Sequence, residues 1–129
     1  MTTLNKILYA EDEADIREIA TLALETIGLL KVATCNSGSQ VIDLALNFKP
    51  QLILLDVMMP DMDGPSTLNA LKKHATLKQI PVIFLTAKIL PDEIQRFKLL
   101  GAIDVINKPF DPVTLADQIK HIWECYHER

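Results

Sequence analysis

The chain has 129 residues, of which 49% are hydrophobic and 23% are charged, and its formal net charge is −4. This length suits one domain with a real core, and the acidic balance argues against direct binding to nucleic acid, which favours a basic surface. No apolar run approaches the roughly 18 residues of a membrane span, and the first residues lack the pattern of a signal peptide. We therefore expect a single cytoplasmic domain over residues 1–129, without membrane contact, in which Cys35 and Cys125 are reduced thiols.

Short apolar runs alternate with amphipathic stretches in the first part of the chain. Residues 6–10 predict a strand, and residues 14–27 predict a helix that ends at Gly28. A weaker strand is expected over 31–35, and a second helix follows the turn at 36–38. The apolar faces expected on these two helices are Ile16, Ile19, Ala20, Ala23, Leu24 and Ile27, and Val41, Ile42, Ala45 and Leu46.

The segment LILLDVMMPDMDG, residues 52–64, begins as an apolar strand and runs into an aspartate and a turn. A carboxylate at the rim of an apolar core is costly unless its charge has a use, so Asp56 marks a candidate site. The remaining elements alternate in the same way, with helices expected over 64–73, 91–100 and 112–127 and strands over 81–85 and 103–106.

Five strands that alternate with five helices predict an α/β protein with a parallel sheet covered on both faces. In such a sheet, ligands bind beyond the carboxyl ends of the strands. The residues that follow the predicted strands are Glu11, Asp12 and Glu13, then Asn36 and Ser37, then Asp56, then Thr86, Ala87 and Lys88, and finally Asn107, Lys108 and Pro109. Carboxylates, hydroxyl groups and lysines thus converge at one edge of the sheet.

Carboxylates that face one another repel unless a cation or a proton lies between them. An oxygen-rich cluster suits Mg²⁺, which keeps several waters and takes one or two protein carboxylates. An aspartate such as Asp56 can also be a nucleophile and form an aspartyl phosphate, provided that positive charge neutralises the phosphoryl oxygens. Mg²⁺ and Lys108 would supply that charge, and the Thr86 hydroxyl would donate a hydrogen bond. Together these groups form a complete set for phosphoryl transfer to Asp56.

Four segments carry a resemblance to a known family. They are YAEDE at 9–13, LLDVMMPDMDG at 54–64, FLTA at 84–87 and NKPF at 107–110. Through these segments and the spacing between them, the chain resembles the receiver domains of two-component response regulators over essentially its whole length. The resemblance implies a flavodoxin-like (βα)5 fold, similar to that of the chemotaxis regulators, with a doubly wound parallel sheet of five strands in the order 2-1-3-4-5.

The resemblance also implies a role for each site residue. Asp56 is expected to accept the phosphoryl group, with Thr86 as the switch hydroxyl and Lys108 as the cation that pairs with it. A cis peptide bond is expected before Pro109, since proline makes such a bond affordable. The expected ligands of Mg²⁺ are Glu11, Asp12, Asp56 and the backbone carbonyl of Met58.

The implied function is a signalling switch that catalyses only its own phosphorylation and dephosphorylation, not an enzyme with a free substrate. Such a domain takes its phosphoryl group from a phosphohistidine of a sensor histidine kinase or a histidine phosphotransfer protein. It then changes a binding surface toward an output protein or effector domain, which the sequence does not name. A stand-alone regulator, a phosphorelay intermediate and a piece of a longer chain all fit this interpretation.

Two features depart from the family pattern. Val105, three residues before Lys108, stands where the family commonly carries an aromatic side chain that turns inward on activation. Leu99 and Leu100 are adjacent in the fourth predicted helix, so both cannot face the core, and an apolar patch exposed there would mark a contact face. We therefore expect phosphorylation-dependent association, including a dimer, through the fourth helix, the fifth strand and the fifth helix.

Three other functions share parts of this pattern. A haloacid-dehalogenase-like phosphatase needs a second aspartate two residues after Asp56, where Met58 stands. A GTPase needs the loop Gly-x-x-x-x-Gly-Lys-Ser/Thr, which the sequence lacks. A pseudo-receiver, an interaction module that is never phosphorylated, stays open as the alternative, although the intact set of site residues argues against it.

Other conspicuous residues have simpler explanations. Glu13 fits a helix N-cap, and Asp61 and Asp63 fit turn positions. Trp123 is expected to pack against the sheet. The histidines expected to be solvated surface residues are His74, His121 and His127.

Overall fold

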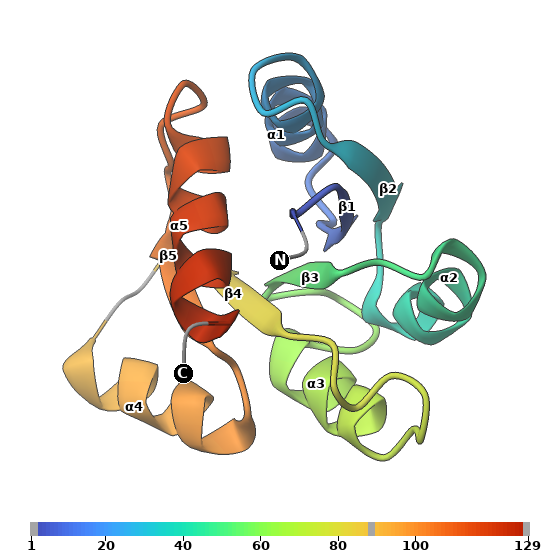
Figure 1. Ribbon diagram of the computed structural model, residues 1–129. Coiled ribbons are helices and arrows are strands. Elements are labelled where there is room, and N and C mark those ends of the chain that lie inside the picture. Colours follow the sequence, from blue (N-terminus) through green and yellow to red (C-terminus); the bar gives the residue numbers. More distant parts are fainter. Residues whose placement is uncertain (1–2, 88–89, 128–129) are drawn as a thin grey trace.

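The structure is a computed structural model that describes residues 3–87 and 90–127 (Figure 1). Its strands are β1 (Lys6–Ala10), β2 (Lys31–Cys35), β3 (Leu52–Asp56), β4 (Val82–Thr86) and β5 (Asp104–Asn107). Its helices are α1 (Ala14–Thr26), α2 (Val41–Phe48), α3 (Gly64–Lys72), α4 (Pro91–Leu100) and α5 (Leu115–His127), with a 3-10 turn, η1 (Gly38–Gln40), before α2. Within the described residues, no helix is both long enough and apolar enough to cross a membrane.

The five strands form one parallel sheet in the order β2-β1-β3-β4-β5, which confirms the predicted fold. Figure 1 shows α1 and α5 on one side of this sheet and α2, α3 and α4 on the other. Because all strands run the same way, their carboxyl ends meet at a single edge. The strand order reverses beside β1 and β3, and ligands of such folds bind at the carboxyl edge next to that reversal.

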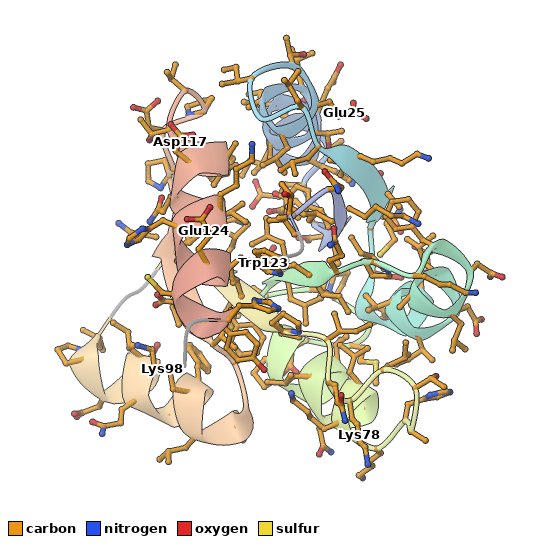
Figure 2. All side chains as sticks on the ribbon, viewed as in Figure 1. Glu25, Lys78, Lys98, Asp117, Trp123 and Glu124 are labelled. Carbon is orange, nitrogen blue, oxygen red and sulfur yellow. The ribbon has the colours of Figure 1, made fainter. Side chains whose placement is uncertain are left out.

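Two apolar layers hold the sheet between its helices. On one face, Leu54 of β3 packs in a cluster with Leu24 of α1 and Trp123 of α5, and Figure 2 shows Trp123 on the side of α5 that faces the sheet. On the other face, Phe84 of β4 meets Phe97 of α4 edge to face, with ring centroids 5.0 Å apart. Burial of each large apolar side chain contributes about 1.5–3 kcal/mol, which explains why the strands read as continuous apolar runs.

The apolar faces of the first two helices are narrower than the sequence predicts. Ile19 and Ile27 are 50% and 51% exposed, and Leu46 is 38% exposed, although we expected all three to face the core. Helix α1 instead packs through Ala20, Ala23 and Leu24, which are its buried residues. The buried stripe is therefore narrow, and residues at its margins remain in water.

Several element boundaries also differ from the prediction. Helix α5 begins at Leu115 and not at residue 112, because Asp111 first forms a turn. Its Oδ1 accepts a hydrogen bond from the Val113 amide, and its carbonyl accepts one from the Thr114 amide. Strands β4 and β5 each begin and end one residue later than expected, which moves Thr86 from the loop to the end of β4.

Candidate functional site

The carboxyl edge of the sheet brings the predicted site residues together. Asp56 ends β3, Thr86 ends β4, Glu11 and Asp12 follow β1, and Lys108 follows β5. Carboxylate oxygens of Glu11, Asp12 and Asp56 all lie within 4.8 Å of one another. The predicted convergence is therefore present. These residues are far apart in the chain and meet because the parallel strands end at the same level.

Asp56 is held at the rim by the backbone around it. Directly after β3, the Val57 amide donates to the Leu85 carbonyl at 3.0 Å. The Gly64 amide then donates back to the Val57 carbonyl at 2.9 Å, which closes the loop onto the strand end. A Cβ atom at Gly64 would lie 2.8 Å from the Asp56 carbonyl oxygen, so glycine is the residue that permits this approach.

Glu11 is fully buried and each of its carboxylate oxygens is bonded. The Tyr9 hydroxyl donates to Oε1 at 3.1 Å, and the Glu13 amide donates to Oε2 at 3.3 Å. The Arg17 guanidinium donates to the Glu11 backbone carbonyl at 2.8 Å. Asp12, in contrast, is exposed, so it is the carboxylate of the cluster that solvent ions reach most easily.

Lys108 ties two of the carboxylates together. Its Nζ lies 2.8 Å from Glu11 Oε1 and 3.2 Å from Asp56 Oδ2. The lysine is positioned through its backbone, because its amide donates to the Thr86 carbonyl at 2.9 Å. The expected cis peptide bond between Lys108 and Pro109 is present. Thr86 is buried, with 7% of its surface exposed, at the end of the neighbouring strand.

The electrostatics of the cluster separate its two buried acids. Burial, reinforced by the hydrogen bond and charge of Glu11, raises the pKa of Asp56 from 3.8 to about 7, and Lys108 offsets only part of this rise. Burial also acts to raise the pKa of Glu11, but its hydrogen bonds with Asp56 and Lys108 outweigh that effect and lower the pKa. At neutral pH, Glu11 therefore stays ionised, while Asp56 is partly protonated.

Lys108 stays charged in this setting. Burial acts to lower its pKa, but the hydrogen bond with Glu11 and the charge of Asp56 more than compensate, so the pKa is raised. Lys108 pairs with two of the three clustered carboxylates, Glu11 and Asp56, so the three carboxylates would outnumber this lysine if all were ionised. All the donors are oxygen atoms, so the residues fit a hard divalent cation such as Mg²⁺.

Sequence reasoning missed two supporting residues, Tyr9 and Gly64. Burial, reinforced by the charge of Glu11, holds the pKa of Tyr9 far above its ordinary range, so the hydroxyl stays protonated and donates to Glu11. Tyr9 precedes Glu11 by two positions, and residues two apart on a strand face the same side, so this signal was available. Lys88, which the sequence also places near the site, lies outside the described residues.

Comparison with known proteins agrees with this geometry. Residues 7–120 match the family model of the response regulator receiver domain. The chain is 39% identical to the phosphate regulon transcriptional regulatory protein PhoB of Klebsiella pneumoniae over 117 residues, which are 91% of this chain and 51% of PhoB. It is 32% identical to the response regulator Rre1 of Synechocystis, over 90% of this chain and 50% of that protein. The chain thus spans about half the length of these curated relatives.

Solved structures show the same architecture over nearly the whole chain. The chemotaxis response regulator CheY4 of Vibrio cholerae is 29% identical and superposes with a TM-score of 0.84 over 93% of this chain and 99% of CheY4. The receiver domain of a DNA-binding response regulator from Colwellia psychrerythraea is 30% identical, with a TM-score of 0.81 over 93% of this chain and 98% of that domain. The motifs, the fold and the acidic edge agree with these relatives, and the chain belongs to the family of response regulator receiver domains.

Proposed function

We propose that the domain accepts a phosphoryl group on Asp56 and thereby switches a protein-binding surface. The observation that carries the proposal is the set of groups around Asp56, with Glu11 and Asp12 within 4.8 Å and Lys108 Nζ 3.2 Å from its Oδ2. Receiver domains are signalling switches, and response regulators act with histidine kinases and output effectors. The proposal assigns each part of this general scheme to a residue of this chain.

The transfer step needs an ionised Asp56. One carboxylate oxygen attacks the phosphorus of a phosphohistidine, the phosphorus–nitrogen bond breaks, and the imidazole leaves with a proton. Lys108, which now pairs with Asp56, then pairs with the phosphoryl oxygens, and the Thr86 hydroxyl donates to another of them. The raised pKa of Asp56 implies that its proton must be displaced before attack, which a cation at the acidic cluster favours.

The acidic cluster is the proposed Mg²⁺ site, as in other receiver domains. Asp12 and Asp56 would hold the ion together with the Met58 backbone carbonyl. Glu11 is already bonded to Tyr9, Lys108 and a backbone amide, so we expect it to act through water. When bound, Mg²⁺ supplies charge neutralisation for the phosphoryl oxygens.

The proposed partners follow from the same chemistry. The phosphodonor is a sensor histidine kinase or a histidine phosphotransfer protein, and the receiver of the signal is an output protein or effector domain. We treat residues 1–129 as one receiver domain that works in the cytoplasm, where ATP is available to such kinases. The relatives named as transcriptional regulators are about twice as long as this chain, so the nature of its output is a separate question.

Phosphorylation by a small donor tests the proposal. Incubation with Mg²⁺ and acetyl phosphate should add one phosphoryl group per chain, measured as intact mass, and EDTA should prevent the gain. Asp56→Asn should abolish it, whereas Asp61→Asn, a nearby exposed acid outside the cluster, should not. A gain of the same size in Asp56→Asn would refute the assignment. No gain in the parent chain would favour a pseudo-receiver that acts without phosphorylation.

A further inference from the structure

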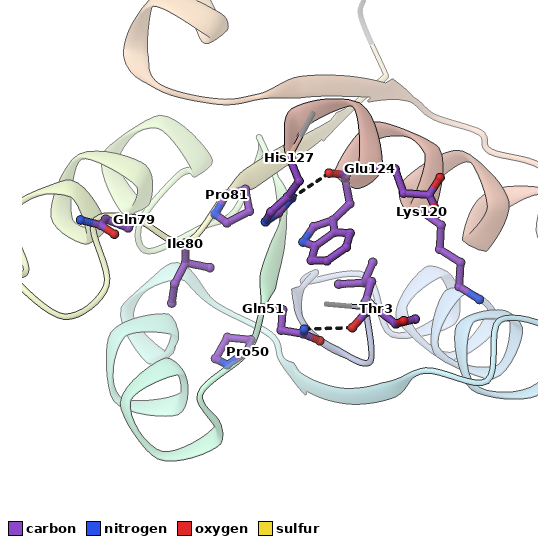
Figure 3. Close-up of a pocket in the computed structure, with 11 residues that line it drawn as sticks. Thr3, Pro50, Gln51, Gln79, Ile80, Pro81, Lys120, Glu124 and His127 are labelled. Carbon is purple, nitrogen blue, oxygen red and sulfur yellow. Dashed lines mark hydrogen bonds between the residues drawn. The ribbon is translucent and has the colours of Figure 1, made fainter. Parts of the chain in front are cut away.

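A pocket of about 1020 Å³ lies at the edge of the sheet opposite the acidic cluster (Figure 3). Pro50 and Gln51 line it just before β3 begins, Pro81 lines it before β4, and the last turns of α5 form another wall. The volume is at the upper end of the range usual for small-molecule sites. None of the residues that we assign to phosphoryl transfer lines this pocket.

Apolar atoms make up most of the pocket wall, and two of its polar residues, Gln51 and Lys120, are engaged in hydrogen bonds. Gln51 Oε1 accepts from the Lys6 amide at 3.0 Å, and Gln51 Nε2 donates to the Thr3 carbonyl at 3.0 Å, as Figure 3 shows. Lys120 Nζ donates to the Gly28 carbonyl at 2.8 Å. Lys120 and Glu124 carry opposite charges, so the pocket offers an ionic ligand no net complement. An uncharged occupant fits this lining.

Trp123, which lines the pocket, carries a buried donor that is unsatisfied. The residue is 5% exposed, and its Nε1 has no hydrogen-bond partner among residues 3–87 and 90–127. A buried polar group without a partner destabilises the folded state. The indole nitrogen can only donate, so a molecule that relieves this cost must bring an acceptor.

The face of the same indole already holds a flat ring. The centroid of the exposed His127 imidazole lies 4.0 Å from that of Trp123, with 39° between the ring planes. His127 belongs to the last turn of α5, and its Nδ1 is hydrogen-bonded to the Trp123 carbonyl at 2.8 Å (Figure 3). A side chain at a helix end can turn aside at little cost, which makes room for a planar ligand.

We propose that this pocket binds an uncharged, planar small molecule that carries a hydrogen-bond acceptor. Once His127 has turned aside, the acceptor bonds to Trp123 Nε1 in the plane of the indole, and the apolar walls formed by Pro50, Ile80 and Pro81 enclose the ring. The site is separate from the phosphoryl-transfer residues. Its ligand would therefore give the domain a second input, independent of the proposed phosphorylation.

Benzamide, a neutral ring with a carbonyl acceptor, is the probe for this site. Trp123 is the only tryptophan, so its indole N–H gives one assigned resonance in ¹⁵N-labelled protein. Benzamide should shift that resonance saturably at millimolar concentration, as expected for so small a ligand. Toluene, which lacks an acceptor, and benzoate, which is charged, should each bind at least about fivefold more weakly than benzamide. Absence of a saturable shift, or equally tight binding of toluene, overturns the proposal.

Three variants, titrated by calorimetry, localise the binding. Trp123→Phe keeps a ring but removes the donor, and should weaken benzamide binding about threefold or more. His127→Ala vacates the place on the indole and should tighten binding about twofold or more. Lys78→Ala, exposed and outside the lining, should leave the affinity unchanged. Unchanged affinity in His127→Ala contradicts the proposed pose even if Trp123→Phe fails to fold. Because the pocket is separate from the phosphoryl-transfer residues, Asp56→Asn should bind benzamide like the parent chain.

Discussion

Asp56 is the residue in which fold and chemistry conflict most. A carboxyl group at the end of a buried strand loses hydration, and Glu11 beside it adds negative charge, so its pKa rises to about 7. Lys108 compensates only in part, at 3.2 Å from Oδ2. The domain thus stores a proton on the group that is proposed to act as nucleophile, and a cation or a phosphoryl group at the edge removes the conflict.

This conflict predicts a stability gain in Asp56→Asn. The folded chain holds a proton on Asp56 that the unfolded chain loses near pH 3.8, so the stabilising contribution of this group declines as pH rises toward 7. Without Mg²⁺ at pH 8, Asp56→Asn should raise the free energy of unfolding by about 1–3 kcal/mol, and at pH 4 the gain should largely vanish. Urea denaturation at both pH values measures this, with Asp61→Asn as the matched control. A loss of stability at pH 8 would contradict the electrostatic account.

Asp12 carries the second residue-scale prediction. It is the exposed carboxylate of the cluster, and removing a hard oxygen ligand leaves Mg²⁺ poorly held. Asp12→Ala should weaken Mg²⁺ binding about tenfold or more by calorimetry. In the parent chain, affinity should also fall as pH decreases through about 7, because the proton on Asp56 competes with the ion. Asp15→Ala, an exposed acid in the first turn of α1, should bind normally, and equal affinities of both variants would place the ion elsewhere.

At the scale of elements, the loop after β3 depends on one close approach. A Cβ atom at Gly64 would lie 2.8 Å from the Asp56 carbonyl oxygen, so glycine lets α3 begin close to the end of β3. Gly64→Ala should therefore lower the free energy of unfolding by about 2 kcal/mol or more, because backbone must move to relieve the clash. Ser66→Ala, exposed in the same helix, should change it by less than about 0.5 kcal/mol. Thermal or urea unfolding of the two variants checks this, and similar values would show that the loop yields easily.

The order and type of the elements could be predicted because each strand is a short apolar run bounded by a turn. Strand ends could also be predicted to within one residue, and with them the convergence of Asp56, Glu11 and Lys108, because parallel strands must finish at one edge. Finer features depend on packing that no periodicity encodes. The exposure of Ile19 depends on which side of α1 is buried, and the late start of α5 at Leu115 results from a turn at Asp111.

The opposite edge of the sheet could not be predicted from the sequence. Its pocket is lined by the N-terminal segment, two loops and α5, and no sequence motif in these segments indicates a binding site. Trp123 was expected to pack against the sheet, and it does, but only the fold shows that its Nε1 lacks a partner. A donor left unpaired by packing is a property of three-dimensional neighbours and has no signature along the chain.

At the scale of the whole molecule, α4 presents an apolar surface. Leu99 is 84% exposed and Leu100 is 48% exposed, while Val105 of β5 is half-buried against the core and offers no aromatic gate. The proposed switch hydroxyl of Thr86 therefore needs a route to this surface other than an aromatic side chain at residue 105. Exposed leucines on a helix that follows the site suit a contact face that changes with phosphorylation.

Leu99→Lys tests this surface. With Mg²⁺ and beryllofluoride as a phosphoryl mimic, we expect the parent chain to associate through α4, β5 and α5, as seen by sedimentation velocity. Leu99→Lys should weaken that association about tenfold or more, because a charge replaces a buried apolar contact. Leu22→Lys, on α1 and 65% exposed, changes a comparable residue on another face and should associate normally. Loss of association in Leu22→Lys alone would move the output face to α1.

Direct mapping of the modified side chain tests the central claim that Asp56 is the phosphoacceptor. Borohydride reduces an acyl phosphate to an alcohol, so the phosphorylated aspartate becomes homoserine and keeps a mass label through digestion. After treatment with Mg²⁺ and acetyl phosphate, the peptide that contains Asp56 should carry this change, and the peptide that contains Glu11 and Asp12 should not. Homoserine at any other aspartate, with Asp56 unchanged, would contradict the account.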